Sequence, residues 1–171
     1  MIDFYVLGSG ISGSIIANLL SKKFSVEIID KANGIGGRAS IKKINKSVIF
    51  DHGLQYFSPK STSFKKYLNE FVKKGILKYW DGNHIDFTFN KKHNQKKIIG
   101  VKGNNDLNKF LLRKIKKKLN EEIIRIKFKD NYWEIFGNKK KFKAKNIIVT
   151  FPFEQTKKIA KNYLKNSFLK L

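Results

Sequence analysis

The sequence predicts an α/β fold with a parallel sheet, organised around a Rossmann-type βαβ unit, and three observations predict it. An apolar run at residues 2–7 ends at a glycine, and a segment with the spacing of an amphipathic helix follows over residues 11–23. A second apolar run covers residues 24–30. A glycine-rich turn joins the first run to the helical segment. Because a strand–helix–strand crossover joins parallel strands, the two runs should be neighbours in a parallel sheet.

The turn after the first strand reads GSGISG, which satisfies the pattern G-x-G-x-x-G. Gly8 permits a sharp turn, Gly10 lets the backbone approach a pyrophosphate, and Gly13 lets the helix pack closely on the strand. The N-terminus of the helix offers N–H groups to the anion. Asp30 ends the second strand twenty residues after Gly10, where a carboxylate accepts from ribose hydroxyls and repels a 2′-phosphate. These features predict a dinucleotide site and disfavour NADP.

A second glycine-rich segment follows at residues 34–40, with the sequence GIGGRAS. A nicotinamide-binding unit normally continues from its acidic residue into another helix, but three glycines in four positions prevent a helix here. The chain should make a second tight turn instead. Arg38, directly after that turn, is available to reach a phosphate.

These segments resemble a known family. Residues 8–17, 30–40 and 50–57, the last reading FDHGLQYF, resemble the flavin amine-oxidase superfamily, in particular its renalase-like branch of small FAD-dependent oxidoreductases. Residues 98–111 resemble a turn and helix of that branch. Residues 133–159 resemble its Trp-containing hairpin, its return strand and its strand-Pro-x-x-Gln junction. The resemblance covers the whole chain in order. It implies that the second glycine turn binds FAD, since NAD would make no use of this turn.

The resemblance also implies which residues hold the FAD. They are Gly8, Gly10, Ile11, Ser12 and Gly13 at the pyrophosphate, Asp30 and Lys31 at the adenosine end, Gly37 and Arg38 around the diphosphate and ribityl region, Gly53, Gln55, Tyr56 and Phe57 near the isoalloxazine ring, and Ile123 lending backbone hydrogen bonds to adenine. Residues 150–152 would return the chain towards the cofactor. No catalytic residue is assigned, because hydride transfer to a flavin needs no strong base from the protein.

Several of these residues have ordinary structural alternatives. Asp30 could be a plain cap or turn aspartate, and Arg38 an exposed surface charge. Tyr56 and Phe57 could simply belong to a hydrophobic core. His52 is interpreted as structural, since a lone histidine beside a strand usually is.

The resemblance divides the chain into three parts. Residues 1–58 would form the FAD-binding βαβ unit with both characteristic segments, residues 59–100 part of an inserted α+β substrate domain, and residues 101–171 the return to the FAD-binding domain. Renalase-like proteins are considerably longer, and their later half shields the flavin. Two hypotheses follow. The chain is an FAD-dependent oxidoreductase that oxidises an amine or a dihydronicotinamide and is reoxidised by oxygen, or it is a truncated or split, non-catalytic nucleotide-binding subunit or remnant that needs a C-terminal partner chain.

The charge raises a third hypothesis. The chain has 37 basic and 13 acidic residues, a net charge of +24, and such a field attracts nucleic acid or an anionic membrane. Only three of the basic residues are arginine, and the lysines are scattered apart from a run at residues 113–118. This distribution is more typical of a solvated surface than of a nucleic-acid site. We therefore expect a small-molecule substrate, no specific nucleic acid and no membrane partner.

Other classes of function are excluded or disfavoured by composition. Without cysteine the chain has no disulfide, no thiolate nucleophile and no cysteine-bound metal. The three histidines lie far apart and give no metal-binding spacing, so no metal is expected. No apolar run approaches eighteen residues, and the N-terminus lacks the pattern of a signal peptide. The expected location is the cytoplasm.

The periodicity of the remaining segments predicts further helices and strands. These are an amphipathic helix at residues 61–74, strands around an Asp-Gly turn within residues 75–90, another strand at residues 96–101, a helix over residues 104–120, a hairpin at residues 121–136 turning at Asp130 and Asn131, and a central strand at residues 145–151.

Overall fold

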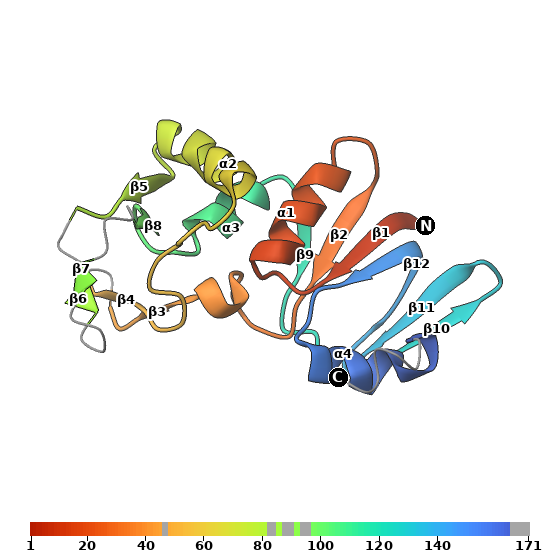
Figure 1. Cartoon of the computed structure of the whole chain (residues 1–171). Helices are drawn as coiled ribbons and strands as arrows, with labels where there is room; N and C mark the ends of the chain where they lie inside the picture. The colour runs from red at the N-terminus through yellow and green to blue at the C-terminus, as the bar shows by residue number, and fades with distance from the viewer. Residues whose placement is uncertain (46–47, 82–84, 87–90, 93–96, 165–171) are drawn as a thin grey trace. The chain divides into compact units, whose positions relative to one another are not determined.

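The structure is a computed structural model that describes residues 1–45, 48–81, 85–86, 91–92 and 97–164 (Figure 1). The chain forms two compact units, Met1–Gly37 with Leu111–Leu171, and Arg38–Phe110. The three-part division at residues 58 and 100 concerns function and stays a prediction.

The first unit contains a six-stranded sheet in the order β10-β11-β12-β1-β2-β9. Its strands are β1 (Ile2–Leu7), β2 (Val26–Ile29), β9 (Lys116–Lys118), β10 (Ile123–Lys129), β11 (Tyr132–Gly137) and β12 (Lys141–Val149). β12, β1, β2 and β9 run parallel, whereas β10, β11 and β12 form an antiparallel meander. The predicted α/β fold with a mostly parallel sheet is therefore confirmed.

Two hydrophobic clusters hold this sheet to its helices, α1 (Ile11–Leu20) and α4 (Phe153–Ala160), the latter followed by the short helix η2 (Lys161–Tyr163). One cluster packs Val6 and Ile28 against Ala17 of α1. The other contains Leu7 together with Ala160 of α4. Neighbouring residues of β1 thus enter different clusters, because successive side chains of a strand point to opposite faces. Full burial of each large apolar side chain contributes about 1.5–3 kcal/mol.

The second unit consists mainly of small antiparallel pairs and helices. After η1 (Gly37–Ala39), its elements are β3 (Ile41–Lys43), β4 (Ile49–Asp51), α2 (Thr62–Lys73), β5 (Leu77–Tyr79), β6 (Ile85–Asp86), β7 (Lys91–Lys92), β8 (Ile98–Gly100) and α3 (Asp106–Leu111). The pairs are β3–β4, β5–β8 and β6–β7. The predicted helix at residues 61–74 is confirmed as α2: Ser61 caps it, and Leu68 and Phe71 are buried. Of the segment predicted as strands, residues 82–84 and 87–90 lie outside the described residues.

The predicted helix over residues 104–120 is wrong beyond Leu111, where α3 ends. The basic run at residues 113–118 is therefore not helical; it includes β9, which pairs in parallel with β2. Leu112 and Ile115 are buried in the core of the first unit. The buried carboxylate of Glu27 has lysine Nζ atoms of β9 at 3.5 and 3.7 Å. Tertiary packing here overrides local helix propensity.

Among the described residues, no helix combines the length and apolarity needed to cross a bilayer.

Candidate nucleotide site

Gly8 and Gly13 build the turn between β1 and α1 and are required by its packing. Gly8 has φ of 107°, a conformation that only glycine adopts readily, and an added Cβ would lie 2.6 Å from Thr150 Oγ1. An added Cβ on Gly13 would collide with the carbonyl oxygen of Gly8. Thr150 follows β12 and donates through its hydroxyl to the Leu7 carbonyl at 2.9 Å. Residues 150–152 thus begin beside the glycine turn.

Gly10 differs from these two glycines because its Cβ position faces open space. An added Cβ would meet nothing within 4 Å, and the residue has an ordinary φ of −65°. Gly10 is the N-cap of α1, where no side chain caps the helix and the first turn carries no acidic residue. The first N–H groups of a helix have no intrahelical acceptor, and they carry the positive end of the helix dipole. The room at Gly10 therefore fits an anion such as a pyrophosphate, held beside Ile11, Ser12 and Gly13.

Asp30 is held in place by Ser9. The backbone N–H and the hydroxyl of Ser9 both donate to Asp30 Oδ2 at 2.6 Å, and Ala32 N donates to Oδ1 at 2.9 Å. A carboxylate offers about four acceptor positions, so about one remains for a ligand hydroxyl. The glycine pattern treats Ser9 as an arbitrary residue, and its role went unpredicted. A hydroxyl side chain between two loop glycines, with an acid at the end of the next strand, is the signal that could have found it.

The second glycine turn lies directly against the first. Gly36 N donates to the Ser9 carbonyl at 3.1 Å, and Gly36 forms a bridge with Gly10. Gly37 has φ of 55°, and an added Cβ would lie 3.0 Å from Gly10 Cα. The structure therefore joins the two glycine segments in one place, with exposed Lys31 following Asp30 in the intervening chain.

The segment that leads into β10 runs beside the end of β2. Glu121 N donates to the Asp30 carbonyl and Asn120 N to the Ala32 carbonyl, both at 3.0 Å. Ile123 begins β10 two residues later, opposite Gly137, and its side chain is buried in the core. The predicted adenine contact would thus come from backbone close to Asp30.

The predicted residues of the second unit form a second group. Arg38 is exposed, and its carbonyl accepts from Leu54 N at 2.7 Å. An added Cβ on Gly53 would collide with this same carbonyl, so glycine is required there for packing. Phe57 is 4% exposed and exchanges two backbone hydrogen bonds with Ile98. Its side chain is part of the hydrophobic core.

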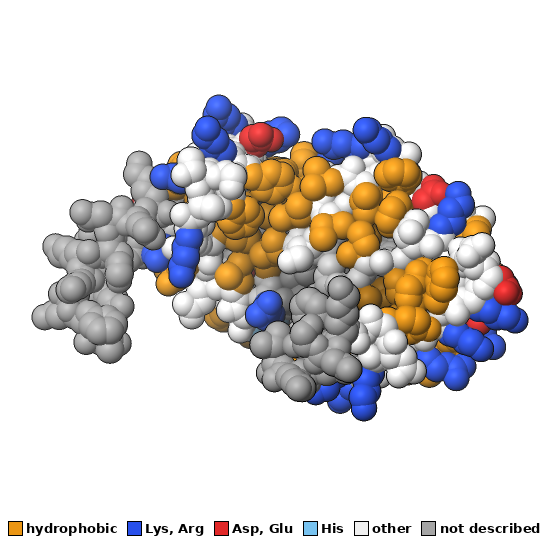
Figure 2. Space-filling model, turned by 45° about the vertical axis from the view of Figure 1, so that its right-hand side comes forward, with side chains coloured by type: hydrophobic (Ala, Val, Ile, Leu, Met, Phe, Trp, Pro, Cys, Tyr) orange, Lys and Arg blue, Asp and Glu red, His pale blue; other side chains and the backbone are white. Residues whose placement is uncertain are grey.

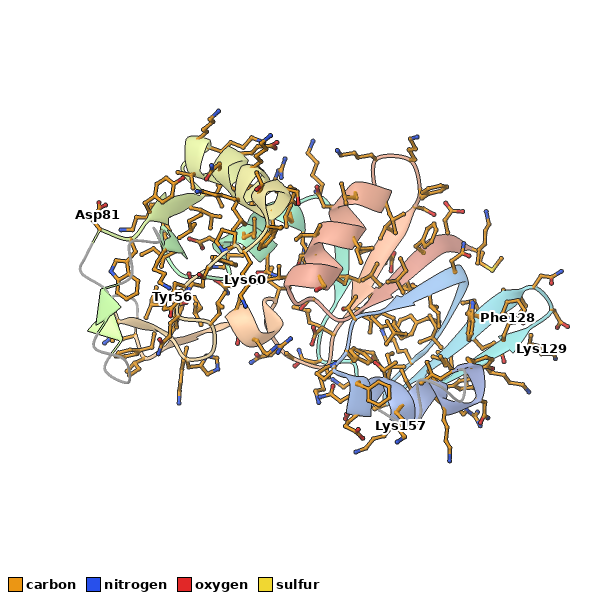
Figure 3. The ribbon with its side chains drawn as sticks, in the orientation of Figure 1. Tyr56, Lys60, Asp81, Phe128, Lys129 and Lys157 are labelled. Carbon is orange, nitrogen blue, oxygen red and sulfur yellow. The ribbon has the colours of Figure 1, made fainter. Side chains whose placement is uncertain are left out.

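Tyr56 and Gln55 have more accessible side chains. The ring of Tyr56, which Figure 3 labels, lies 6.0 Å from the Trp80 ring, and Lys97 Nζ lies 4.3 Å from the centroid of the Tyr56 ring. The Gln55 side chain is exposed, while its carbonyl accepts from the Asn104 amide at 2.9 Å. The positions of these residues relative to a flavin stay predictions.

Comparisons with known proteins agree with a Rossmann-type fold. Residues 6–71 match the family described as NAD(P)-binding Rossmann-like domain. This range contains the glycine turns and Asp30. A comparison with curated proteins gave no match.

Solved structures match nearly the whole chain. A protein named as a protoporphyrinogen oxidase, from Exiguobacterium sp. 255-15, aligns with a TM-score of 0.74 at 9% identity, covering 99% of this chain and 64% of that one. Two variants of putrescine oxidase, redesigned in cofactor binding, align with TM-scores of 0.73 and 0.74 at 12% identity, covering 99% of this chain and 62% of theirs. The chain therefore has the fold of these oxidases over 62–64% of their length. Because 563 chains match, the fold alone does not select an activity.

Proposed function

We propose that this chain binds FAD and forms part of a flavin oxidoreductase of the renalase-like, amine-oxidase kind. The observation that carries the proposal is the contact between the two glycine turns, with Gly36 and Gly37 against Ser9 and Gly10. A second glycine turn at this place gives more backbone for a long, diphosphate-containing cofactor than a single Rossmann turn gives. The oxidase fold of the similar structures supports the proposal.

Each part of the first unit has a distinct proposed task. Backbone N–H groups at the start of α1 bind the pyrophosphate, and the opening at Gly10 admits it. The Asp30 carboxylate accepts from one ribose hydroxyl, and Lys31 lies near the same end. Gly37 continues the backbone surface beside Gly10, and the backbone of Ile123 serves adenine.

In the second unit, Arg38, Gly53, Gln55, Tyr56 and Phe57 are proposed to serve the diphosphate and flavin end, as the resemblance implies. FAD, when bound, supplies hydride-acceptor chemistry; the protein supplies binding, orientation and electrostatics. We further propose that the substrate is an amine or a dihydronicotinamide, that oxygen is the final acceptor, and that the protein acts in the cytoplasm.

A second candidate function is a nucleotide-binding subunit or remnant without turnover of its own. The chain spans 62–64% of the length of the similar structures, so the activity of a whole oxidase is itself part of the proposal for this chain. Peroxide release that begins only when a C-terminal partner chain is added would support this candidate. Substrate-dependent peroxide release by the chain alone would support the first.

FAD fluorescence titration tests the binding proposal. The wild type should quench FAD saturably, and Gly10→Glu should weaken binding at least tenfold, because an acidic side chain would occupy the open space and repel a pyrophosphate. Ser63→Glu, which adds the same charge on the exposed surface of α2, is the matched control and should bind as the wild type does. Equal binding by both variants, or no binding by folded wild type, would overturn the proposal.

A further inference from the structure

The outward face of the β10–β11–β12 meander gathers basic side chains that are scattered in the sequence. β10 and β12 each contribute three exposed cations, at alternate positions: Arg125, Lys127 and Lys129, and Lys141, Lys143 and Lys145. The middle strand contributes Tyr132, Glu134 and Phe136. Cross-strand register places Arg125 and Lys141 on either side of Phe136. It places Lys127 and Lys143 on either side of Glu134. We refer to these nine residues as the basic sheet face.

The opposite face of the meander accounts for this alternation. Ile126, Ile135 and Ala144 are buried in the core that includes Ala160 of α4. The basic sheet face is therefore the solvent side of a half-buried antiparallel sheet. Its cations form two rows about 9–10 Å apart, since neighbouring strands lie about 4.8 Å apart, and side chains within a row repeat about every 6.8 Å.

Aromatic rings lie between the two rows of cations. The Arg125 guanidinium carbon is 4.1 Å from the Phe136 ring centroid, and Lys141 Nζ is 5.1 Å from it. Lys143 Nζ is 5.0 Å from the Tyr132 ring centroid. Arg125 is one of only three arginines in the chain. A guanidinium plane stacked on a ring offers a base the same kind of flat surface that the ring itself offers.

Few acidic groups neutralise this face. Within the described residues, its ion pairs are Lys129 with Asp130 at 3.7 Å and Lys145 with Asp3 at 2.7 Å, both at its margin. Lys129 and Phe128 mark the end of β10 in Figure 3. Figure 2, which shows one side of the chain, also has many more basic than acidic side chains in view.

Protection of a sheet edge does not explain the pattern. Lysines on an edge strand discourage pairing with other chains, and β10 is an edge strand. β12, however, is an inner strand of the sheet, which pairs with β11 over residues 141–144 and with β1 from Ala144 onward. Edge protection therefore does not account for Lys145, which lies in the part of β12 that pairs with β1. A ligand that carries repeated negative charge accounts for both rows.

We propose that the basic sheet face binds single-stranded nucleic acid without sequence specificity. The two rows of cations bind phosphates, and the rings with their stacked guanidinium receive bases. An anionic lipid surface would also bind the cations, but rings that lie between two rows of cations match the bases and phosphates of a single strand and therefore favour nucleic acid. The activity is independent of the proposed FAD site, none of whose predicted residues belongs to this face.

Fluorescence anisotropy of the full chain with labelled oligo-dT, over a salt series, tests the proposal. The triple variant Lys127→Gln, Lys141→Gln, Lys143→Gln should bind at least tenfold more weakly. The slope of log affinity against log salt should fall by about 2, since each phosphate contact with a single strand contributes about 0.7. The matched triple variant Lys22→Gln, Lys23→Gln, Lys66→Gln removes the same charge from exposed positions outside this face and should bind nearly as the wild type does. Equal losses in the two triple variants would overturn the proposal in favour of general charge attraction.

A variant that removes an aromatic ring distinguishes binding to nucleic acid from binding to other polyanions. Tyr132→Leu should weaken oligo-dT binding about fivefold or more, leave binding to heparin or phosphatidylserine vesicles unchanged, and be rescued by Tyr132→Phe. If Tyr132→Leu binds oligo-dT like the wild type, the face is a simple polyanion surface and the proposal is wrong. Circular dichroism and Tm confirm that each variant is folded.

Discussion

The Asp30 carboxylate receives two hydrogen bonds of 2.6 Å from Ser9, one from its backbone N–H and one from its hydroxyl. Ser9 lies between the first two glycines of the turn, and Asp30 ends the neighbouring strand. The pair thus fixes the anion-binding turn relative to the acid that is proposed to bind a ribose. Preorganisation of this kind reduces the ordering cost of ligand binding.

Ser9→Ala should destabilise the chain and weaken FAD binding together. The variant keeps the backbone hydrogen bond but loses the hydroxyl donor to a charged acceptor, which costs about 1.5–3 kcal/mol. Urea denaturation measures the loss. Ser21→Ala, which removes an exposed hydroxyl hydrogen bond to Asn18 O, is the control and should cost less than about 1 kcal/mol. Equal stability of the two variants would contradict a role for Ser9 in holding Asp30.

Gly10→Ala and Gly13→Ala should have different effects on the free energy of unfolding, because Gly10 faces open space and Gly13 is packed against backbone. Gly13→Ala places a methyl group on the Gly8 carbonyl and should lower the free energy of unfolding by more than about 2 kcal/mol. Gly10→Ala meets nothing within 4 Å and should change it by less than about 1 kcal/mol. Thermal unfolding of both variants checks this order. The opposite order would mean that the turn is packed differently.

Tyr5 should make the stability sensitive to alkaline pH. Burial, and then the charge of Glu27 to which it donates at 3.0 Å, raise the pKa of Tyr5 above its ordinary value of 10.0. The folded chain therefore keeps a proton that the unfolded chain releases. Stability from this group is complete below pH 10 and falls as the pH rises above 10, by up to about 1.4 kcal/mol per pH unit.

The variant Tyr5→Phe tests this dependence. It should be less stable at pH 7, because the buried Glu27 carboxylate loses a donor, yet lose less further stability between pH 9 and pH 11 than the wild type. Urea denaturation at several pH values gives both quantities. Parallel pH profiles for wild type and variant would show that Tyr5 does not carry the effect.

Asn104 should be critical for the second unit. It is fully buried; its Oδ1 accepts from Gly100 N at 2.9 Å, and its Nδ2 donates to the carbonyls of Leu54 and Gln55 at 2.6 and 2.9 Å. Asn104→Ala leaves these buried backbone groups without partners and should cost about 2–4 kcal/mol. Hydrogen exchange should show loss of protection at Gly100, whose N–H donates to Asn104, and in the segment at residues 54–57 that Asn104 holds through its carbonyls. Unchanged exchange there would contradict the importance of these bonds.

Local patterns predicted the elements whose formation depends on nearby residues. The β1–α1–β2 unit follows from apolar spacing around glycines. The β10–β11 hairpin turns at Asp130 and Asn131, which adopt positive φ of 49° and 63° as a tight hairpin turn requires. The helix predicted over residues 112–120 is wrong, because the spacing of Leu112 and Ile115 fits a helix as well as it fits the observed loop and strand. Only the open position beside β2, a long-range feature, makes β9 a strand.

The candidate site also has features that the sequence predicted and features that it could not predict. Three glycines and an acid at the expected distance predicted the turn and its partner strand. Spacing alone could not distinguish Gly10, which faces open space, from Gly13, which is closed by backbone. Nor could it find the Ser9 hydroxyl on Asp30, since that contact depends on how the two strands are paired.

The most direct test of the FAD site is the visible absorption spectrum of the purified chain after addition of FAD and removal of free ligand by desalting. We predict that the wild type retains the flavin bands and that Gly10→Glu, although folded, loses them. Soluble, folded wild type that retains no flavin would contradict the FAD site.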